Sequence, residues 1–276
     1  MPPSKNPKRE SKDGLLYIAS CLGWTSEPSR SVQKFHSVRN NGQVTDMREF
    51  PFVVYLHPVT SNGTQGICTA SLLSSRHVLT AAHCATYMDL SYDNVVRAGS
   101  WSYQTLYPNG GWGQERIVKK ITIHPEWDKH PQNDLAILEV DPFELNSYVN
   151  VVEIHADDSF VDSRPNLDVF MLGFGYTLTD PPRPQNLQVG WAKTVDRRTC
   201  QNDWDTLCSK VQCICSDRSP CKIQVTDTEI CLQGVSRATG GDSGGPLIFF
   251  HEKWVQMGLA SWGGEEPRKF RIPGSF

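Results

Sequence analysis

Short apolar runs separated by turn residues are the feature that most constrains how this 276-residue chain can fold. The runs are rich in β-branched and aromatic side chains, and helical periodicity is hard to find over any long window. Turn signals containing glycine or proline lie between them. The pattern therefore predicts an all-β barrel or sandwich. The expected strands lie within residues 50–56, 71–82, 116–124, 134–140, 167–175, 245–250 and 254–263.

The composition is that of a globular protein with one large or two small cores, because 38% of the residues are hydrophobic and 21% are charged. The formal net charge of -3 does not indicate a protein that binds nucleic acid or a membrane surface. No apolar run approaches the roughly 20 residues that a membrane-spanning helix needs. We therefore expect neither a nucleic-acid partner nor a membrane partner.

The N-terminal segment differs from the rest of the chain. Residues 1–14 are polar with several basic side chains, and residues 15–23 form a short apolar run. This order fits either a secretory signal peptide with a long basic region or a disordered tail. Residues 1–35 are therefore interpreted as an N-terminal tail or as a signal or pro-segment.

The cysteines favour an extracellular protein. There are nine, and if Cys21 leaves with a signal segment, the remaining eight can all pair. Several lie close together within residues 200–231, which is typical of disulfide-bonded secreted proteins. A zinc site at Cys213 and Cys215 competes with this interpretation, but their spacing is one residue shorter than a usual zinc knuckle, so we expect no metal. The glycosylation sequon at residues 62–64 is compatible with secretion.

A histidine, an aspartate and a serine stand in three short stretches that together indicate nucleophilic catalysis. Alone, each has a plain explanation as a packed histidine, a turn residue or a loop. Together they supply a serine hydroxyl, a base that titrates near neutral pH and a carboxylate that can orient this base. The stretches are LTAAHC (79–84), NDLAILEV (133–140) and GDSGGPL (241–247), which contain His83, Asp134 and Ser243.

These motifs, in the order His, Asp, Ser, resemble the chymotrypsin/trypsin-like serine proteases. The resemblance covers about residues 36–276 and implies two six-stranded antiparallel β-barrels with the active site in the cleft between them. The first barrel, about residues 44–150, would supply the histidine and the aspartate. The second, about residues 165–276, would supply the serine.

The resemblance also implies how the substrate is held. Gly241 permits a tight turn, so that the N–H groups of Gly241 and Ser243 form an oxyanion hole. In a comparable enzyme, the loss of one such donor costs roughly 3–4 kcal/mol of transition-state stabilisation. Ser261, Trp262 and Gly263 resemble the segment that pairs with the substrate backbone.

Two disulfides are implied in the same way. Cys68 and Cys84 match the bridge that closes the loop bearing the catalytic histidine. Cys231 resembles one half of a bridge in the second barrel, with Cys221 as its expected partner and Cys213 or Cys215 as alternatives. Because six cysteines allow 15 pairings, the residues alone do not choose among them.

Specificity and cross-linking depart from the family pattern. Arg237 stands where trypsins carry an aspartate at the base of the specificity pocket. A basic floor would repel Lys and Arg, so we expect no trypsin-like specificity and a preference for acidic or small apolar residues. Thr239 and Phe249 stand where the family has cysteines, and the partners of those cysteines are missing too.

The two ends of the protease region also depart from the pattern. In the family, a newly cut N-terminal amine pairs with the aspartate before the serine, here Asp242. Residues 36–43 contain no sequence like the usual Ile-Val-Gly-Gly, and cleavage after Arg39 or Ser37 would not create one. The family continues beyond the position of Gly263 through a last strand and a helix. We therefore expect the second barrel to be incomplete at its C-terminal end, with an open sheet edge.

Two functions follow from the resemblance. The first is a secreted, monomeric serine endopeptidase, made as a zymogen and acting through an acyl-enzyme on Ser243 without a cofactor. Its partners would be a polypeptide substrate, an activating protease and a protein inhibitor. The alternative is a catalytically silent homologue that acts as a binding or regulatory protein in a proteolytic cascade. Such homologues often lose a catalytic residue, and this chain keeps all three, which favours the enzyme.

Overall fold

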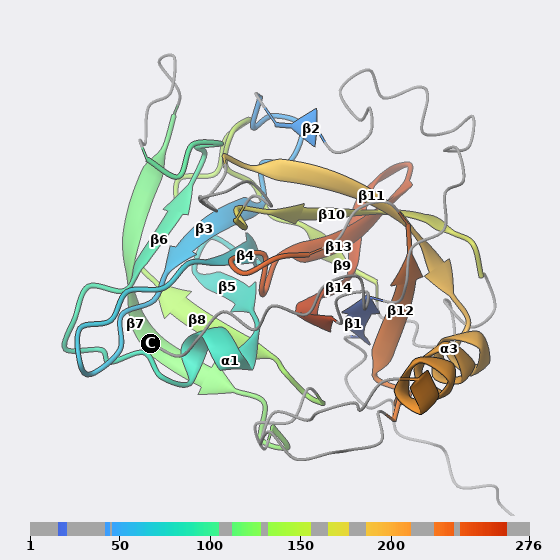
Figure 1. Ribbon diagram of the computed structural model, residues 1–276. Helices are drawn as coiled ribbons and strands as arrows, with labels where there is room; N and C mark the ends of the chain where they lie inside the picture. The colour runs from blue at the N-terminus through green and yellow to red at the C-terminus, as the bar shows by residue number, and fades with distance from the viewer. Residues whose placement is uncertain are drawn as a thin grey trace, which may run out of the picture.

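The computed structural model is built mostly of β-strands, in two assemblies that lie side by side (Figure 1). The prediction of an all-β class is therefore confirmed. Within the described ranges there are only two helices, α1 (Ala82–Ala85) and α3 (Arg197–Lys210). The structure describes residues 16–20, 42–44, 46–104, 112–127, 132–155, 165–176, 186–210, 224–234 and 238–263.

The first assembly is a closed barrel of six antiparallel strands in the order β3-β4-β5-β8-β7-β6. Pairing of β3 with β6 closes it, so no strand edge is left open. Ala136, Leu138 and Val140 alternate with more exposed residues and point into its core, as the twofold period of a strand requires. The strands are β3 (Val53–His57), β4 (Cys68–Leu72), β5 (His77–Thr80), β6 (Val95–Ala98), β7 (Gln114–Ile123) and β8 (Ala136–Val140).

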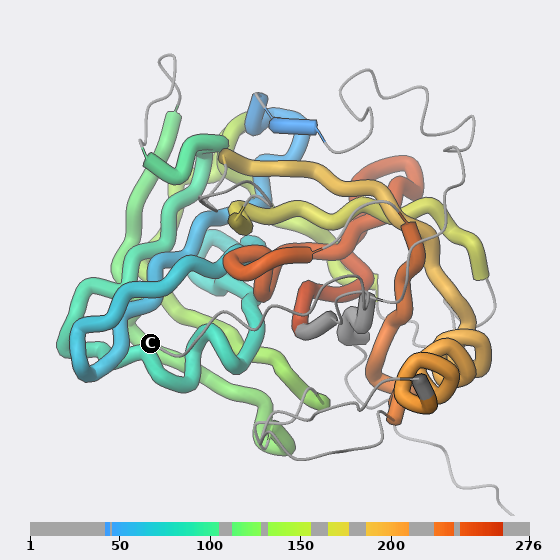
Figure 2. Tube along the Cα trace, viewed as in Figure 1, coloured from blue at the N-terminus to red at the C-terminus, as the bar shows by residue number. Residues whose placement is uncertain are grey.

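The second assembly is a sheet in which five antiparallel strands follow the order β12-β11-β10-β13-β14. The short β9 (Glu153–Ile154) runs parallel to β14, and β2 (Gly42–Gln43) pairs with β11. The chain then passes from β2 in this sheet to β3 in the first barrel (Figure 2). The main strands are β10 (Asp168–Gly173), β11 (Gln188–Val195), β12 (Glu229–Gln233), β13 (Pro246–His251) and β14 (Lys253–Gly263).

A strand from the N-terminal segment closes this second sheet. β1 (Leu16–Ser20) lies between β12 and β14 and runs parallel to both, so the pairings form a ring of six strands. The expectation of an open edge is corrected by this strand, because β1 pairs with the edges of β12 and β14 that would otherwise be open. Residues 16–20, which sequence analysis assigned to a leader or a tail, therefore supply the sixth strand.

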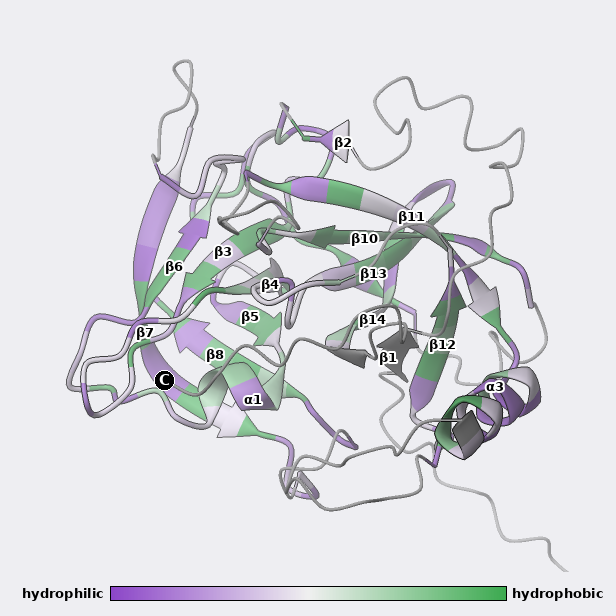
Figure 3. Cartoon of the chain, viewed as in Figure 1, coloured by the Kyte–Doolittle hydropathy of each residue, from purple (hydrophilic) through white to green (hydrophobic). Residues whose placement is uncertain are grey.

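Apolar side chains fill each assembly and the space between them. In Figure 3 hydrophobic residues, coloured green, recur along the strands of both assemblies. The cluster between the assemblies joins Phe52 and Tyr55 around β3 to Phe170 and Trp191 on β10 and β11. The ring of Tyr55 meets that of Phe174 edge to face, with centroids 5.4 Å apart. This shared cluster sets the position of one barrel relative to the other, and hence of the residues between them.

Two disulfides join described cysteines. Cys68–Cys84 links β4 to α1. Cys200–Cys231 links α3 to β12, so the expectation that Cys231 pairs with Cys221, or with an alternative, is wrong. The physical reason is that α3 packs against β12 and brings the two Cα atoms to 6.1 Å. Cys208 is disulfide-bonded as well, and Cys213, Cys215 and Cys221 lie outside the described residues.

Candidate active site

His83 is carried by α1, a single helical turn that directly follows β5. So short a helix is not stable in isolation. Here buried Ala82 and Ala85 anchor it to the first barrel, and the disulfide of Cys84 ties it to β4. The His83 side chain remains 39% exposed, so its imidazole is open to a substrate.

Asp134 lies under His83 just before β8. Its Oδ2 is 2.6 Å from His83 Nδ1, its Oδ1 accepts the His83 backbone N–H at 2.8 Å, and only 4% of its side chain is exposed. Asn133 has φ +57°, a left-handed conformation that asparagine tolerates better than most residues. This turn comes directly before Asp134. The aspartate thus fixes both the ring and the backbone of the histidine.

Asp134 also accepts a 2.6 Å hydrogen bond on Oδ2 from the Ser261 hydroxyl of β14. Burial by itself raises the pKa of Asp134. The hydrogen bonds from His83 and Ser261, together with the charge of His83, outweigh burial and hold this pKa below its ordinary value. The carboxylate is therefore ionised at neutral pH and can stabilise a positive charge on His83.

Ser243 stands in a turn that both barrels hold. Its carbonyl accepts the N–H of Thr69 from the first barrel at 2.9 Å, and the next N–H, that of Gly244, donates to Ala260 of β14 at 2.7 Å. Gly244 has φ +80°, and a Cβ there would lie 2.1 Å from Thr80 Oγ1. Only glycine permits this close approach of the loop to the first barrel.

The N–H groups of Gly241 and Ser243 donate no hydrogen bond to any part of the chain that the structure describes. Gly241 itself has φ +98°. Two unused donors beside a serine hydroxyl can bind an oxygen that becomes negatively charged. In the same described residues, no hydrogen bond joins the Ser243 hydroxyl to His83, a contact that is often loose before substrate binds.

The family model named Trypsin matches residues 39–276 of this chain. This chain belongs to the trypsin family. It is 27% identical over 256 residues to Chymotrypsin-C of Rattus norvegicus, covering 90% of this chain and 85% of that protein. It is 27% identical over 251 residues to CLIP domain-containing serine protease B10 of Anopheles gambiae, covering 81% and 62%. It is 28% identical over 221 residues to Phenoloxidase-activating factor 3 of Holotrichia diomphalia, covering 75% and 58%.

Asp242, the residue that the trypsin-family resemblance links to activation, is partly buried in the loop directly before Ser243. Its Oδ1 accepts the N–H of Gly175, and its Oδ2 accepts both the N–H and the hydroxyl of Thr239. Burial raises the pKa of Asp242 against the opposing effect of these hydrogen bonds. No ion pair among the described residues includes Asp242.

The expected substrate-pairing segment of this trypsin-family chain forms the end of β14. On one edge Trp262 pairs with Ala19 and Gly263 with Ser20, whereas β13 pairs with β14 only as far as Leu259. Across the described residues, the second edge at 261–263 therefore has no strand partner. Arg237, the expected specificity residue, lies outside the described residues.

Sequence analysis overlooked Thr69, which is fully buried in β4. Its hydroxyl donates to the Gly241 carbonyl at 2.9 Å and accepts the N–H of Phe174 at 3.0 Å. Thr69 therefore joins the serine loop, the second barrel and the first barrel. No local motif marks this role, because its partners lie more than 100 residues away. The described residues contain no cluster of side chains suited to hold a metal ion.

Proposed function

We propose that this chain is a serine endopeptidase that hydrolyses peptide bonds through an acyl-enzyme on Ser243. The observation that carries the proposal is the pairing of His83 with Asp134, which binds both the imidazole ring and the backbone N–H of the histidine. The serine loop beside this pair holds two N–H groups, those of Gly241 and Ser243, that donate to no described residue. The catalytic domain would span residues 36–276, with barrels at about 44–150 and 165–276, preceded by residues 1–35.

In this mechanism, His83 removes the proton of the Ser243 hydroxyl as its oxygen attacks the substrate carbonyl. Asp134 keeps Nδ1 protonated, so that Nε2 is free to act as the base, and stabilises the imidazolium. The negative oxygen of the tetrahedral intermediate accepts hydrogen bonds from the N–H groups of Gly241 and Ser243. His83 then protonates the departing amine, and it activates the water that releases the acyl group.

Substrate selection would use the free edge of residues 261–263, to which an extended peptide can add by backbone pairing. Arg237 would form a basic pocket floor that disfavours Lys and Arg and favours acidic or small apolar residues. Comparing arginine-, phenylalanine- and aspartate-containing peptide substrates tests this specificity. Fast cleavage after arginine would contradict it.

We further propose that the protein is secreted as a monomeric zymogen, with an activating protease and a protein inhibitor as partners. Two disulfides between described cysteines favour an oxidising compartment. Among the described helices, none is long and apolar enough to cross a membrane. Asp242, whose partly buried carboxylate accepts hydrogen bonds from Gly175 and Thr239, is the group that a new N-terminal amine would meet on activation.

Labelling with a serine-directed phosphonate tests the enzyme, with Ser243→Ala as the matched control and circular dichroism to show that both fold. We expect the wild type alone to be labelled, with limited proteolysis near Arg39 if activation is needed. A folded wild type that takes no label even then would favour the second function, a catalytically silent homologue that binds or regulates proteins of a cascade. The observation that favours this alternative is that residues 36–43 contain no activation sequence like Ile-Val-Gly-Gly.

A further inference from the structure

We propose that Asn62, at the tip of the connection between β3 and β4, is a site of N-linked glycosylation. Asn62-Gly63-Thr64 is the single Asn-X-Ser/Thr sequence with X other than proline in the whole chain. In the reaction, Asn62 Nδ2 forms a bond to C1 of a sugar carried on a lipid pyrophosphate. The C1–O bond to the pyrophosphate breaks, and Nδ2 loses one proton. The proposal rests on passage through the secretory pathway, as proposed above.

The tip of the β3–β4 connection is exposed to solvent, and backbone hydrogen bonds hold the residues that flank it. Residues 61–65 are all exposed. Below them Val59 bridges to Gln65, and the Thr60 N–H donates to the Thr64 carbonyl at 3.0 Å. A Cβ placed on Gly63 would meet nothing within 4 Å, which shows open space at the turn. A bulky, hydrated group can therefore be carried here without displacing packed side chains.

The Asn62 side chain uses its two polar atoms differently. Its Oδ1 accepts the Thr64 N–H at 3.0 Å and the Thr60 hydroxyl at 2.5 Å. Its Nδ2 makes no hydrogen bond within the part of the chain that the structure describes. Glycosylation leaves the oxygen unchanged and replaces one hydrogen on the nitrogen. The attached glycan would therefore preserve every hydrogen bond that the Asn62 side chain makes in this turn.

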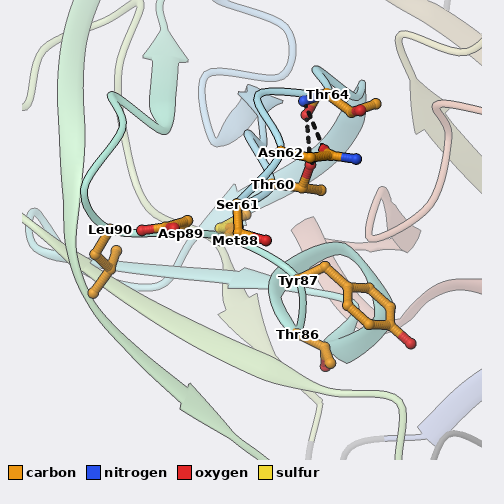
Figure 4. A pocket seen from close by; sticks show the side chains of 9 residues that line it. All are labelled: Thr60, Ser61, Asn62, Thr64, Thr86, Tyr87, Met88, Asp89 and Leu90. Atoms are coloured by element: carbon orange, nitrogen blue, oxygen red, sulfur yellow. Dashed lines mark hydrogen bonds between the residues drawn. The ribbon is translucent and has the colours of Figure 1, made fainter.

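A pocket beside Asn62 could contact the sugars nearest to the asparagine. A pocket of about 690 Å³ lies between residues 60–64 and residues 86–90, which directly follow the helix of His83. Tyr87 and Leu90 at its rim are 59% and 48% exposed. In Figure 4 the Asn62 amide nitrogen points away from Leu90, on the side on which the Tyr87 ring extends. A glycan on this nitrogen would cover exposed apolar surface at the pocket.

The test uses the full chain, exported from a eukaryotic host behind a leader peptide of that host, so that export does not depend on residues 1–35. Four proteins are compared by intact mass before and after an amidase that removes N-linked glycans. These are the wild type, Asn62→Gln, Thr64→Ala and Thr64→Ser. Thr64→Ser is the matched control, because it keeps the sequon and a hydroxyl at the same position.

We expect the wild type and Thr64→Ser to lose the mass of a glycan on treatment, and the peptide containing residue 62 to gain about one dalton as asparagine becomes aspartate. Asn62→Gln and Thr64→Ala should have the mass of the bare chain throughout. Exported wild type that contains the Cys68–Cys84 disulfide but has the bare mass would overturn the proposal. None of these readouts uses proteolytic activity, so failure of the enzyme proposal would leave the result unaffected.

Discussion

The backbone N–H of Thr69 in the first barrel donates a 2.9 Å hydrogen bond to the carbonyl of Ser243 in the second. The Thr69 hydroxyl adds bonds to Gly241 and Phe174. The first barrel carries His83, so these contacts set the position of the serine loop relative to the histidine. One buried threonine thus links the two halves of the candidate site.

Thr69→Val should destabilise the fold and weaken the site. The change keeps the shape but leaves two buried polar groups without partners, each costing about 1–3 kcal/mol. We expect a lower urea midpoint and slower phosphonate labelling of Ser243. Thr69→Ser, which keeps the hydroxyl, should remain close to the wild type. Equal behaviour of the valine and serine variants would show that the hydroxyl does not hold the loop.

Asp134 and Asp242 should affect acid stability in opposite directions. The pKa of Asp134 is lower in the folded state than its ordinary value of 3.8. The ionised carboxylate therefore stabilises the fold above pH 3.8, and this stabilisation is lost as the pH falls through the lower folded pKa. The pKa of Asp242 is raised, so the folded state gains stability as pH falls through that value toward 3.8.

Urea midpoints measured across pH for Asp134→Asn and Asp242→Asn check this pair. Below pH 3.8, the stability of Asp134→Asn should decrease less with falling pH than that of the wild type. Above pH 3.8, the stability of Asp242→Asn should increase less with falling pH than that of the wild type. Asp227→Asn, on an exposed turn, is the control and should follow the wild-type curve. Parallel curves for all three variants would contradict the opposite roles.

Gly175→Ala should disrupt the site through Asp242. A Cβ at Gly175 would lie 2.5 Å from the carboxylate carbon and both oxygens of Asp242. Displacing this carboxylate should lower stability by roughly 1–3 kcal/mol and reduce phosphonate labelling of the adjacent Ser243. Gly240→Ala is the matched control, because it also replaces a glycine near Ser243, but its Cβ would meet only the Tyr176 ring at 3.8 Å, an ordinary contact distance. Labelling of Gly175→Ala at the wild-type rate would show that displacing the Asp242 carboxylate does not affect Ser243.

Ile18→Pro should weaken the second sheet. Proline has no N–H and does not fit a central strand, and Ile18 pairs with both Ile230 and Ala260. We expect a lower urea midpoint and faster amide exchange at residues 229–232 and 258–260. Ile18→Val, which suits a strand, should remain near the wild type. A mature secreted protein whose N-terminal residue lies beyond residue 20 would show that β1 is absent from the working form.

The all-β class could be predicted from the sequence because strand propensity and turn chemistry are local properties. The short runs of apolar residues correspond to β3, β5, β7, β8, β10, β13 and β14. The candidate catalytic residues also stood out locally, since each lies in a short motif. The helix α3 was missed, although Asp196 caps it through the Thr199 N–H and buried Cys200 and Trp204 are four residues apart.

Pairing over long separations was decided only by the tertiary structure. The bond of Cys231 to Cys200, the place of residues 16–20 between β12 and β14, and the bond of Ser261 to Asp134 join positions 31 to more than 200 residues apart. No local pattern encodes such partners, because each depends on how the barrels close and pack. The sequence by itself determined which residues can do chemistry and that the chain forms strands. The closed sheets determined which of those residues meet.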